Sequence, residues 1–494
     1  MMKKRSSGIL LHISSLPGPY GIGDFGKGAY DFVDFLDRAG VKNWQILPLG
    51  ITGFGDSPYQ NFSAFAGNPY FIDLDELLEE EFLVPEEIEL FPLGDDPTRV
   101  DYGILYRNKM ELLKRANKRA RRKLDAELKK FYEDEKSWLR DYALFMAIKG
   151  EQNGSPWLKW PQELKNIHSD EVLEFERSHE KEMFFHVFIQ YFFFKQWKRL
   201  KNYANDKNIR IIGDIPIYVA EDSSDFWGNP TNFKIDSNLE PLTVAGCPPD
   251  AFSKTGQLWG NPIYDWKAME EDGYSWWVER IRSSFELYDM VRIDHFRGFE
   301  AYWEIKNGSI NAVKGEWVKG PNYKLFQKVK EELGEMNIIA EDLGFLTEEV
   351  YDLIGKTGYP GMKVLQFAFD AREESNYLPH TYDTNCVVYT GTHDNDTIMG
   401  WVRNVKSEDL IYAGKYLKLS FEEGLNWGFI RGAFSSVADL CIIPMQDILG
   451  LGEEARMNTP STLGNNWVWR MKDDAITNRI VEKISNLTRM YGRY

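Results

Sequence analysis

The chain contains little cysteine and little histidine, three Cys and seven His in 494 residues. No two of the cysteines, Cys247, Cys386 and Cys441, have the spacing of a zinc site or a redox motif. Two of them lie inside apolar runs, where cysteine usually acts as a small buried hydrophobic residue. This usage is typical of a protein from a reducing compartment.

The chain also lacks a run of about 20 apolar residues, which excludes an ordinary transmembrane helix. The nearest candidate, residues 183–194, is interrupted by His186 and Gln190 and is better interpreted as a buried helix. Residues 1–5 are basic, but the apolar segment after them is too short for a signal peptide. We therefore expect a cytoplasmic protein without a membrane partner.

Basic residues are outnumbered, with 59 Lys and Arg against 76 Asp and Glu, which gives a formal charge of −17. An acidic field of this kind repels nucleic acids and anionic membrane surfaces. The one basic stretch, residues 114–130, is best interpreted as the solvated face of a helix. We therefore expect a neutral substrate and no nucleic-acid partner.

Eight short apolar runs recur along the chain, and helical patterns follow most of them. Runs that are apolar on both faces suit parallel strands covered by helices. They comprise residues 8–11, 44–49, 209–219, 290–293, 337–340, 362–367, 386–389 and 440–444. Alternating strands and helices predict a parallel α/β fold, and eight strands favour a closed (β/α)8 TIM barrel over an open sheet.

The helix after the first run has the clearest pattern. Asp31, Asp34 and Asp37 mark its solvated face, and it ends at Gly40. Its apolar face consists of Phe32, Phe35, Leu36 and Ala39. Further helices are predicted over residues 275–288, 323–336, 347–353 and 475–494.

Two connections are too long for a plain barrel. The first, about residues 51–200, is highly charged and predicts an inserted, mostly helical subdomain after the second strand. The second, about residues 220–275, is rich in Pro, Gly, Trp and Asn, has no helical period, and predicts a loop-rich subdomain after the third strand. We therefore predict a single catalytic barrel over residues 1–494 that carries both insertions.

Polar side chains follow every predicted strand. The carboxyl ends of barrel strands converge on one face, where active sites lie. Any one of these residues could simply cap a helix or form a surface ion pair, but together they predict one concave polar site. The set is His12, Tyr59, Asp214, Arg292, Asp294, His295, Glu341, Asp342, Asp370, His393, Asp394 and Asp447.

Carboxylates predominate in this set, and glycosidic bonds are cleaved by a carboxylate pair, one ionised and one protonated. Arg292 lies two residues before Asp294, so both side chains leave the strand on one face, and the guanidinium should keep Asp294 ionised. Glu341 follows an apolar strand and neighbours Asp342, which should raise its pKa as a general acid requires.

Three other chemistries have less support in the sequence. Residues 21–26 have the GxGxxG spacing of a dinucleotide loop, but Pro17 and Pro19 separate them from the strand. His12, His295 and His393 could line a metal site, yet no H-x-H or H-E-x-x-H spacing occurs. A serine nucleophile would need a G-x-S-x-G turn, which is missing.

Aromatic residues reach 15% of the chain, including 16 Trp, and most are expected in the core. Tyr59 and Trp259 differ, because each lies in a polar loop that contains Gly or Pro. An aromatic face there can stack on a sugar ring while neighbouring amides and carboxylates bind its hydroxyls.

Eight motifs spread over nearly the whole chain carry a specific resemblance. They are SSLPGPYGIGDFG at 14–26, DSPYQ at 56–60, GDIPIYVA at 213–220, PPDAFSKTGQLWGNPIY at 248–264, VRIDHFRGF at 291–299, AEDLG at 340–344, GTHDNDT at 391–397 and EARMNTP at 454–460. With them the sequence resembles the 4-α-glucanotransferase family, also called amylomaltase or disproportionating enzyme.

The resemblance implies retaining transfer of α-1,4-glucan segments on an α-amylase-type barrel, without a metal or cofactor. Asp294 would be the nucleophile, Glu341 the acid/base, and Asp394 the third carboxylate, which holds and distorts the bound glucose. Donors would be maltooligosaccharides and starch- or glycogen-derived glucans, and acceptors glucose or maltooligosaccharides. The alternatives are an α-amylase-type hydrolase and a carbohydrate-binding protein on an inactive barrel, which would be expected to lack one of the three carboxylates.

The resemblance also implies the sugar contacts. Arg292 and His393 would touch the same glucose, and Tyr59 would stack on it. Many members have Gly where Ser461 stands and one Asn before the Trp, so the alignment on Trp467 favours Asn466 but leaves Asn465 open. The complete implied set is Tyr59, Asp214, Asp250, Gln257, Trp259, Arg292, Asp370, His393 and Asn466, with Asp250, Gln257 and Trp259 in a mobile loop beside the acceptor.

Overall fold

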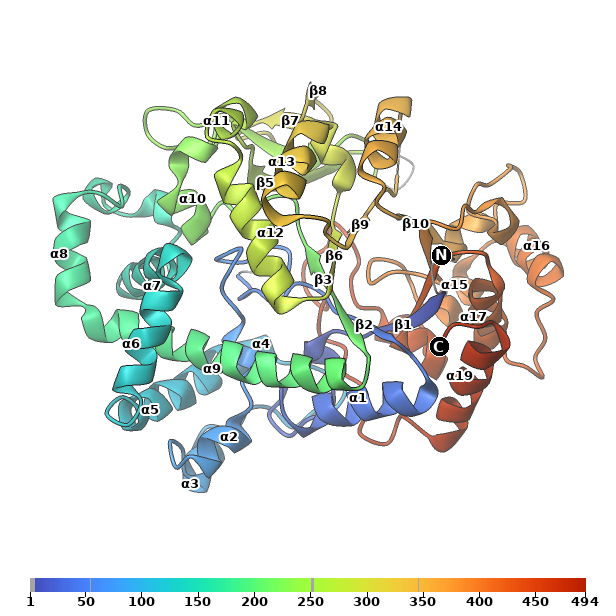
Figure 1. Ribbon diagram of the computed structural model, residues 1–494, viewed down its shortest axis with the longest axis horizontal. Coiled ribbons are helices and arrows are strands. Elements are labelled where there is room, and N and C mark those ends of the chain that lie inside the picture. The colour runs from blue at the N-terminus through green and yellow to red at the C-terminus, as the bar shows by residue number, and fades with distance from the viewer. Residues whose placement is uncertain (1–4, 54, 250–252, 345) are drawn as a thin grey trace.

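The computed structural model describes residues 5–53, 55–249, 253–344 and 346–494. Within them, eight parallel strands form one sheet in which each strand pairs with the next of the eight along the chain, except the fifth with the sixth. They are β1 (Ser6–Leu10), β2 (Asn43–Gln45), β3 (Arg210–Ile215), β6 (Met290–Ile293), β9 (Ile338–Ala340), β10 (Gly361–Val364), β11 (Cys386–Tyr389) and β12 (Leu440–Pro444). β1 also pairs with β12, and the Ala340 N–H donates to the Pro360 carbonyl at 3.0 Å. This bond bridges β9 and β10, so the sheet is a nearly closed barrel, as predicted (Figure 1).

Three strands, β6, β11 and β12, coincide with the predicted runs. β3 is shorter than its run because Pro216 follows Ile215 directly. Proline has no N–H to donate to a neighbouring strand, so the ladder ends there.

Helix α1 (Lys27–Ala39) has the predicted faces. Phe32, Phe35, Leu36 and Ala39 are buried, while Asp31 and Asp37 are exposed. Gly40 ends the helix with φ of 73°, a left-handed conformation that favours glycine. The later helices are α12 (Ser275–Leu287), α13 (Tyr323–Leu333), α14 (Glu348–Thr357), α15 (Ile398–Asn404), α16 (Ser407–Leu417), α17 (Leu425–Ser435), α18 (Met445–Leu449) and α19 (Asn478–Met490).

Helices fill the long connection between β2 and β3. They are α2 (Leu74–Glu79), α3 (Pro85–Leu90), α4 (Tyr102–Ile104), α5 (Met110–Ala120), α6 (Asp125–Asp134), α7 (Lys136–Glu151), α8 (Asp170–Ser178) and α9 (Glu180–Asp206). α9 contains the predicted buried segment, and the amide of Gln190 exchanges two hydrogen bonds with the backbone of Gly67, at 2.7 and 2.9 Å. In Figure 1, α5 to α8 lie on the side of the molecule opposite α15 to α19. No helix in the described parts of the chain is both long and apolar enough to cross a membrane.

The connection between β3 and β6 has more regular structure than its composition suggests. It contains α10 (Ser224–Gly228), α11 (Trp266–Glu271), β4 (Thr243–Cys247) and β5 (Gln257–Pro262). β4 and β5 join β7 (Ala301–Lys306) and β8 (Glu316–Lys319) in an antiparallel sheet of order β5-β4-β7-β8. This sheet was not predicted from the sequence, because its strands are short and two of them come from after β6.

Candidate active site

A buried arginine links two other predicted site residues. Asp214 on β3 lies directly opposite Arg292 on β6, and Arg292 Nη1 donates to both Asp214 oxygens at 2.8 and 2.7 Å. Arg292 Nη2 lies 2.9 Å from Asp294 Oδ1, which confirms that both side chains leave β6 on one face. Burial alone would lower the pKa of Arg292, but the carboxylates of Asp214 and Asp294 outweigh it and raise this pKa well above its ordinary value. The guanidinium is therefore a permanent positive charge at the centre of the site.

Asp294 and Glu341 occupy corresponding positions on neighbouring strands. Ile293 pairs with Ala340, so the next residue of each strand, Asp294 and Glu341, comes at the same level of the barrel. The backbone N–H of His295 donates to Glu341 Oε2 at 2.7 Å, and the N–H of Leu343 donates to Oε1 at 2.7 Å. The residue after Asp294 thus binds Glu341 directly.

His295 makes this bond from a left-handed conformation, with φ of 53°. This region disfavours residues other than glycine and is typical of functional sites. The strained turn points the N–H toward the Glu341 carboxylate. The turn after β6 is thereby joined to the Glu341 carboxylate after β9.

The carboxyl groups of Asp294 and Glu341 have different pKa values. Burial raises the pKa of Glu341 to about 8, and the charge of Asp294 adds to the rise, as the apolar strand before Glu341 predicted. Burial also raises the pKa of Asp294 to about 6, although Arg292 opposes it. Arg292 lowers the pKa of Asp294, as predicted, but burial outweighs it. Glu341 is therefore the weaker acid of the two, and 30% of the Asp294 side chain is exposed.

Tyr59, His393 and Asp394 form the adjoining part of the site. The Tyr59 hydroxyl donates to Asp214 Oδ2 at 2.9 Å and lies 3.0 Å from His393 Nε2. Its one proton goes to the carboxylate, so the nearby His393 nitrogen must carry a hydrogen. The Tyr59 and His393 rings are stacked, with centroids 5.3 Å apart. His393 Nε2 lies 3.3 Å from Asp394 Oδ2, and 40% of the Asp394 side chain is exposed and free to meet a ligand.

Gln257 and Trp259 lie on β5, and Trp259 Nε1 donates to Gln257 Oε1 at 3.1 Å. The Trp259 ring meets the ring of His295 edge-on, with centroids 4.8 Å apart, so β5 reaches the residue after Asp294. Asp250 lies outside the described residues.

The structure does not bring Asp370 and Asn466 into contact with these groups. The carboxylate of Asp370 binds Arg372 in its own loop. Asn466 accepts from the Thr459 N–H at 3.0 Å and donates to Thr462, while Asn465 accepts from Arg99. Their sugar-binding roles stay predictions.

Two residues of the site were missed, although their motif was noticed. Asn458 Nδ2 donates to Asp394 Oδ1 at 2.6 Å, and Arg456 Nη2 donates to the Asp394 carbonyl at 2.7 Å. Both belong to the EARMNTP segment, which follows β12 and returns to β11 only in the folded protein. The sequence contains the motif, but nothing in it indicates that Asn458 and Arg456 contact Asp394.

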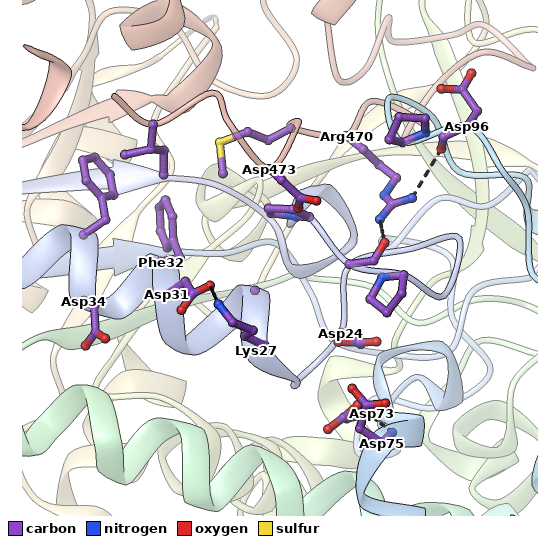
Figure 2. A pocket seen from close by; sticks show the side chains of 18 of the residues that line it. Asp24, Lys27, Asp31, Phe32, Asp34, Asp73, Asp75, Asp96, Arg470 and Asp473 are labelled. Carbon is purple, nitrogen blue, oxygen red and sulfur yellow. Dashed lines mark hydrogen bonds and ion pairs between the residues drawn. The ribbon is translucent and has the colours of Figure 1, made fainter. Parts of the chain in front are cut away.

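A cavity of about 1180 Å³ opens away from these carboxylates, beside α1 (Figure 2). Asp24, from the GxGxxG segment, lies in it together with Asp73, Asp75 and Asp96. Aspartates outnumber the basic residues of the cavity lining, which are Lys27, Arg38, Lys207 and Arg470, so the cavity would repel a pyrophosphate and disfavours the dinucleotide interpretation. Over the described ranges, no three His, Cys, Asp or Glu side chains are grouped as a metal would require.

The chain is similar to known proteins along its whole length. The family model described as 4-alpha-glucanotransferase matches residues 11–477. The 4-alpha-glucanotransferases of Clostridium butyricum and Thermus thermophilus are 55% and 50% identical, over 98% and 94% of this chain and 100% and 95% of theirs. Amylomaltase from Streptococcus agalactiae, solved in complex with acarbose, is 42% identical and superposes with a TM-score of 0.97 over 99% of this chain and 100% of that one. The chain therefore belongs to the 4-α-glucanotransferase family.

Proposed function

We propose that this protein transfers a segment of an α-1,4-glucan to the 4-hydroxyl of glucose or a maltooligosaccharide, through a covalent glycosyl-enzyme. The observation that carries the proposal is the Asp294–Glu341 pair, set side by side on β6 and β9 with unequal acidities, in a chain of this family. Retaining glycosyl transfer requires such a pair, one group ionised and one protonated.

In the first step, Asp294 attacks the anomeric carbon while Glu341 gives its proton to the departing glycosidic oxygen. The C–O bond to the leaving sugar breaks as the bond to Asp294 forms. In the second step, Glu341 takes the proton of the acceptor 4-hydroxyl, whose oxygen displaces Asp294. Two inversions restore the α-linkage. This mechanism predicts that the two carboxyl groups lie about 5–5.5 Å apart.

The remaining site residues would bind the sugar. Asp394 would hold the ring that reacts, with Arg292, His393 and Tyr59 around it. Asp214 would act through Arg292 and Tyr59, whose positions it fixes. The proposal assigns the acceptor side to Asp250, Gln257 and Trp259, and further contacts to Asp370 and Asn466.

We place the enzyme in the cytoplasm, acting on maltooligosaccharides and on glucans derived from starch or glycogen. Cys386 and Cys441 are buried free thiols, in keeping with a reducing compartment. The excess of acidic residues is compatible with neutral sugars as substrates.

Incubation with maltotriose alone should give a ladder of longer and shorter maltooligosaccharides together with glucose. An acceptor sugar that reaches the intermediate before water regenerates an α-1,4 bond, so the number of such bonds stays constant. Chromatography of the products and a reducing-end assay at successive times check this. Conversion to short sugars only, with a steady rise in reducing ends, would indicate an α-amylase-type hydrolase.

The value of kcat/KM should follow a bell-shaped pH profile with its maximum near neutral pH. Asp294 must be ionised, so activity falls as the pH drops through its pKa of about 6. Glu341 must be protonated, so activity falls again as the pH rises through about 8. Initial rates at low maltotriose concentration between pH 4 and 10 measure both limbs. A profile that stays flat above pH 8 would contradict the assignment of Glu341 as the acid.

A further inference from the structure

The EARMNTP segment binds the loop after β11 along its backbone. The N–H of Asn458 donates to the His393 carbonyl at 3.0 Å, and Arg456 Nη2 donates to the carbonyl of Asp394 at 2.7 Å. Two residues of one segment thus bind the peptide groups on both sides of Asp394. This loop carries the third carboxylate of the site.

The side chain of Asn458 continues this contact into the site. Its Nδ2 donates to Asp394 Oδ1 at 2.6 Å, while Oδ2 lies 3.3 Å from His393 Nε2. A carboxylate has about four lone-pair positions, so these contacts leave others free. Since 40% of the Asp394 side chain is exposed, those positions can meet sugar hydroxyls.

Asn458 is itself held in place by its neighbours. Its carbonyl accepts from Arg456 Nε at 2.8 Å. The adjacent carbonyl of Met457 accepts from the Trp467 N–H at 2.7 Å, which closes the loop over residues 458–466 at its base. The amide therefore comes from a fixed backbone, whereas Asp394 is the partly exposed partner. Asn458 is therefore the partner that restricts the movement of the Asp394 carboxylate.

We propose that Asn458 is a positioning residue for Asp394, fixing the rotation of its carboxylate so that the free lone pairs face the hydroxyls of the reacting sugar. This role rests on the proposed function, because it assumes that Asp394 binds the sugar. A hydrogen bond to a charged group contributes enough that its loss should lower kcat/KM by about 10- to 100-fold. The loss should be larger in kcat than in KM if Asp394 binds the distorted sugar more tightly than the relaxed one.

Asn458→Ala tests the size of the effect, and Asn458→Asp tests its cause. The aspartate variant has nearly the same shape but replaces the N–H donor by a second carboxylate. At neutral pH the two negative charges repel each other, and kcat/KM should fall at least as far as in the alanine variant. At acidic pH the new carboxyl group is protonated and can donate to Asp394. The ratio of variant to wild-type kcat/KM should then rise by about tenfold between pH 8 and pH 5.

Asn238→Asp is the matched control, because Asn238 Nδ2 lies 3.4 Å from Asp236 Oδ2 in an exposed turn. This variant should keep wild-type activity, with a constant ratio across the pH range. The proposal is overturned if kcat/KM of Asn458→Ala lies within threefold of wild type. It is also overturned if the ratio of Asn458→Asp to wild-type kcat/KM does not change with pH. If Asn458→Ala does not fold stably, the test is the pH dependence of the ratio of Asn458→Asp to wild-type kcat/KM. A wild-type enzyme that produces no ladder from maltotriose would instead refute the proposed function.

Discussion

Asp294→Asn is expected to lower kcat for maltotriose disproportionation by at least about 10⁴-fold, in the range found when other enzymes lose their nucleophile. The amide has no negative charge to attack the anomeric carbon, so no glycosyl-enzyme can form. The substitution keeps the shape of the side chain, and Arg292 keeps both hydrogen bonds to Asp214. Binding of maltoheptaose, measured by calorimetry, should therefore stay within a few-fold of wild type.

Asp289→Asn provides the control for this experiment. Asp289 precedes β6 at its other end, where its carboxylate accepts from the Ile211 N–H and from Asn205 Nδ2, each at 2.8 Å. The same chemical change there should lower the melting temperature but leave kcat near wild type. If Asp294→Asn folds, binds maltoheptaose and still turns over at a wild-type rate, Asp294 is not the nucleophile.

Much of the barrel follows from patterns local to the chain. The runs 290–293, 386–389 and 440–444 became β6, β11 and β12 without change, because buried parallel strands are apolar on both faces. The same patterns could not reveal β7 and β8. β7 pairs with β4, which comes from before β6, and β8 joins the small sheet through β7. Such pairings depend on the three-dimensional path of the chain, which no local period records.

The site shows the same division between local and distant causes. Arg292 and Asp294 are two residues apart on one strand, and their ion pair was predicted from that spacing alone. The effect of burial on the pKa of Asp294 was not predicted, because burial depends on neighbouring strands and loops. The bond from Asn458 to Asp394 spans 64 positions in sequence, so only the folded protein shows it.

Glu341→Gln is expected to lower kcat for maltotriose by about 10²- to 10⁴-fold, the usual contribution of a general acid or base. The amide cannot protonate the leaving oxygen, and it cannot take a proton from the acceptor. The glutamine side chain has nearly the same shape. Its one oxygen can still accept a hydrogen bond from the backbone N–H of either His295 or Leu343, so the fold should persist. The alkaline limb of the pH profile should disappear, because the group that titrates there is gone.

A maltosyl fluoride donor separates the two roles of Glu341. Fluoride departs without a proton, so Asp294 can still form the glycosyl-enzyme in the glutamine variant. The second step then lacks its base, and the intermediate should accumulate to a level visible as added mass on the intact protein. Azide needs no base to attack the glycosyl-enzyme, so added azide should release the sugar from Asp294 as a glycosyl azide. Glu87→Gln, in α3 at a carboxylate paired with Arg115 and Arg119, should leave both steps unchanged. If the Glu341 variant processes maltotriose and the fluoride equally slowly and accumulates nothing, Glu341 is not the group that transfers the proton.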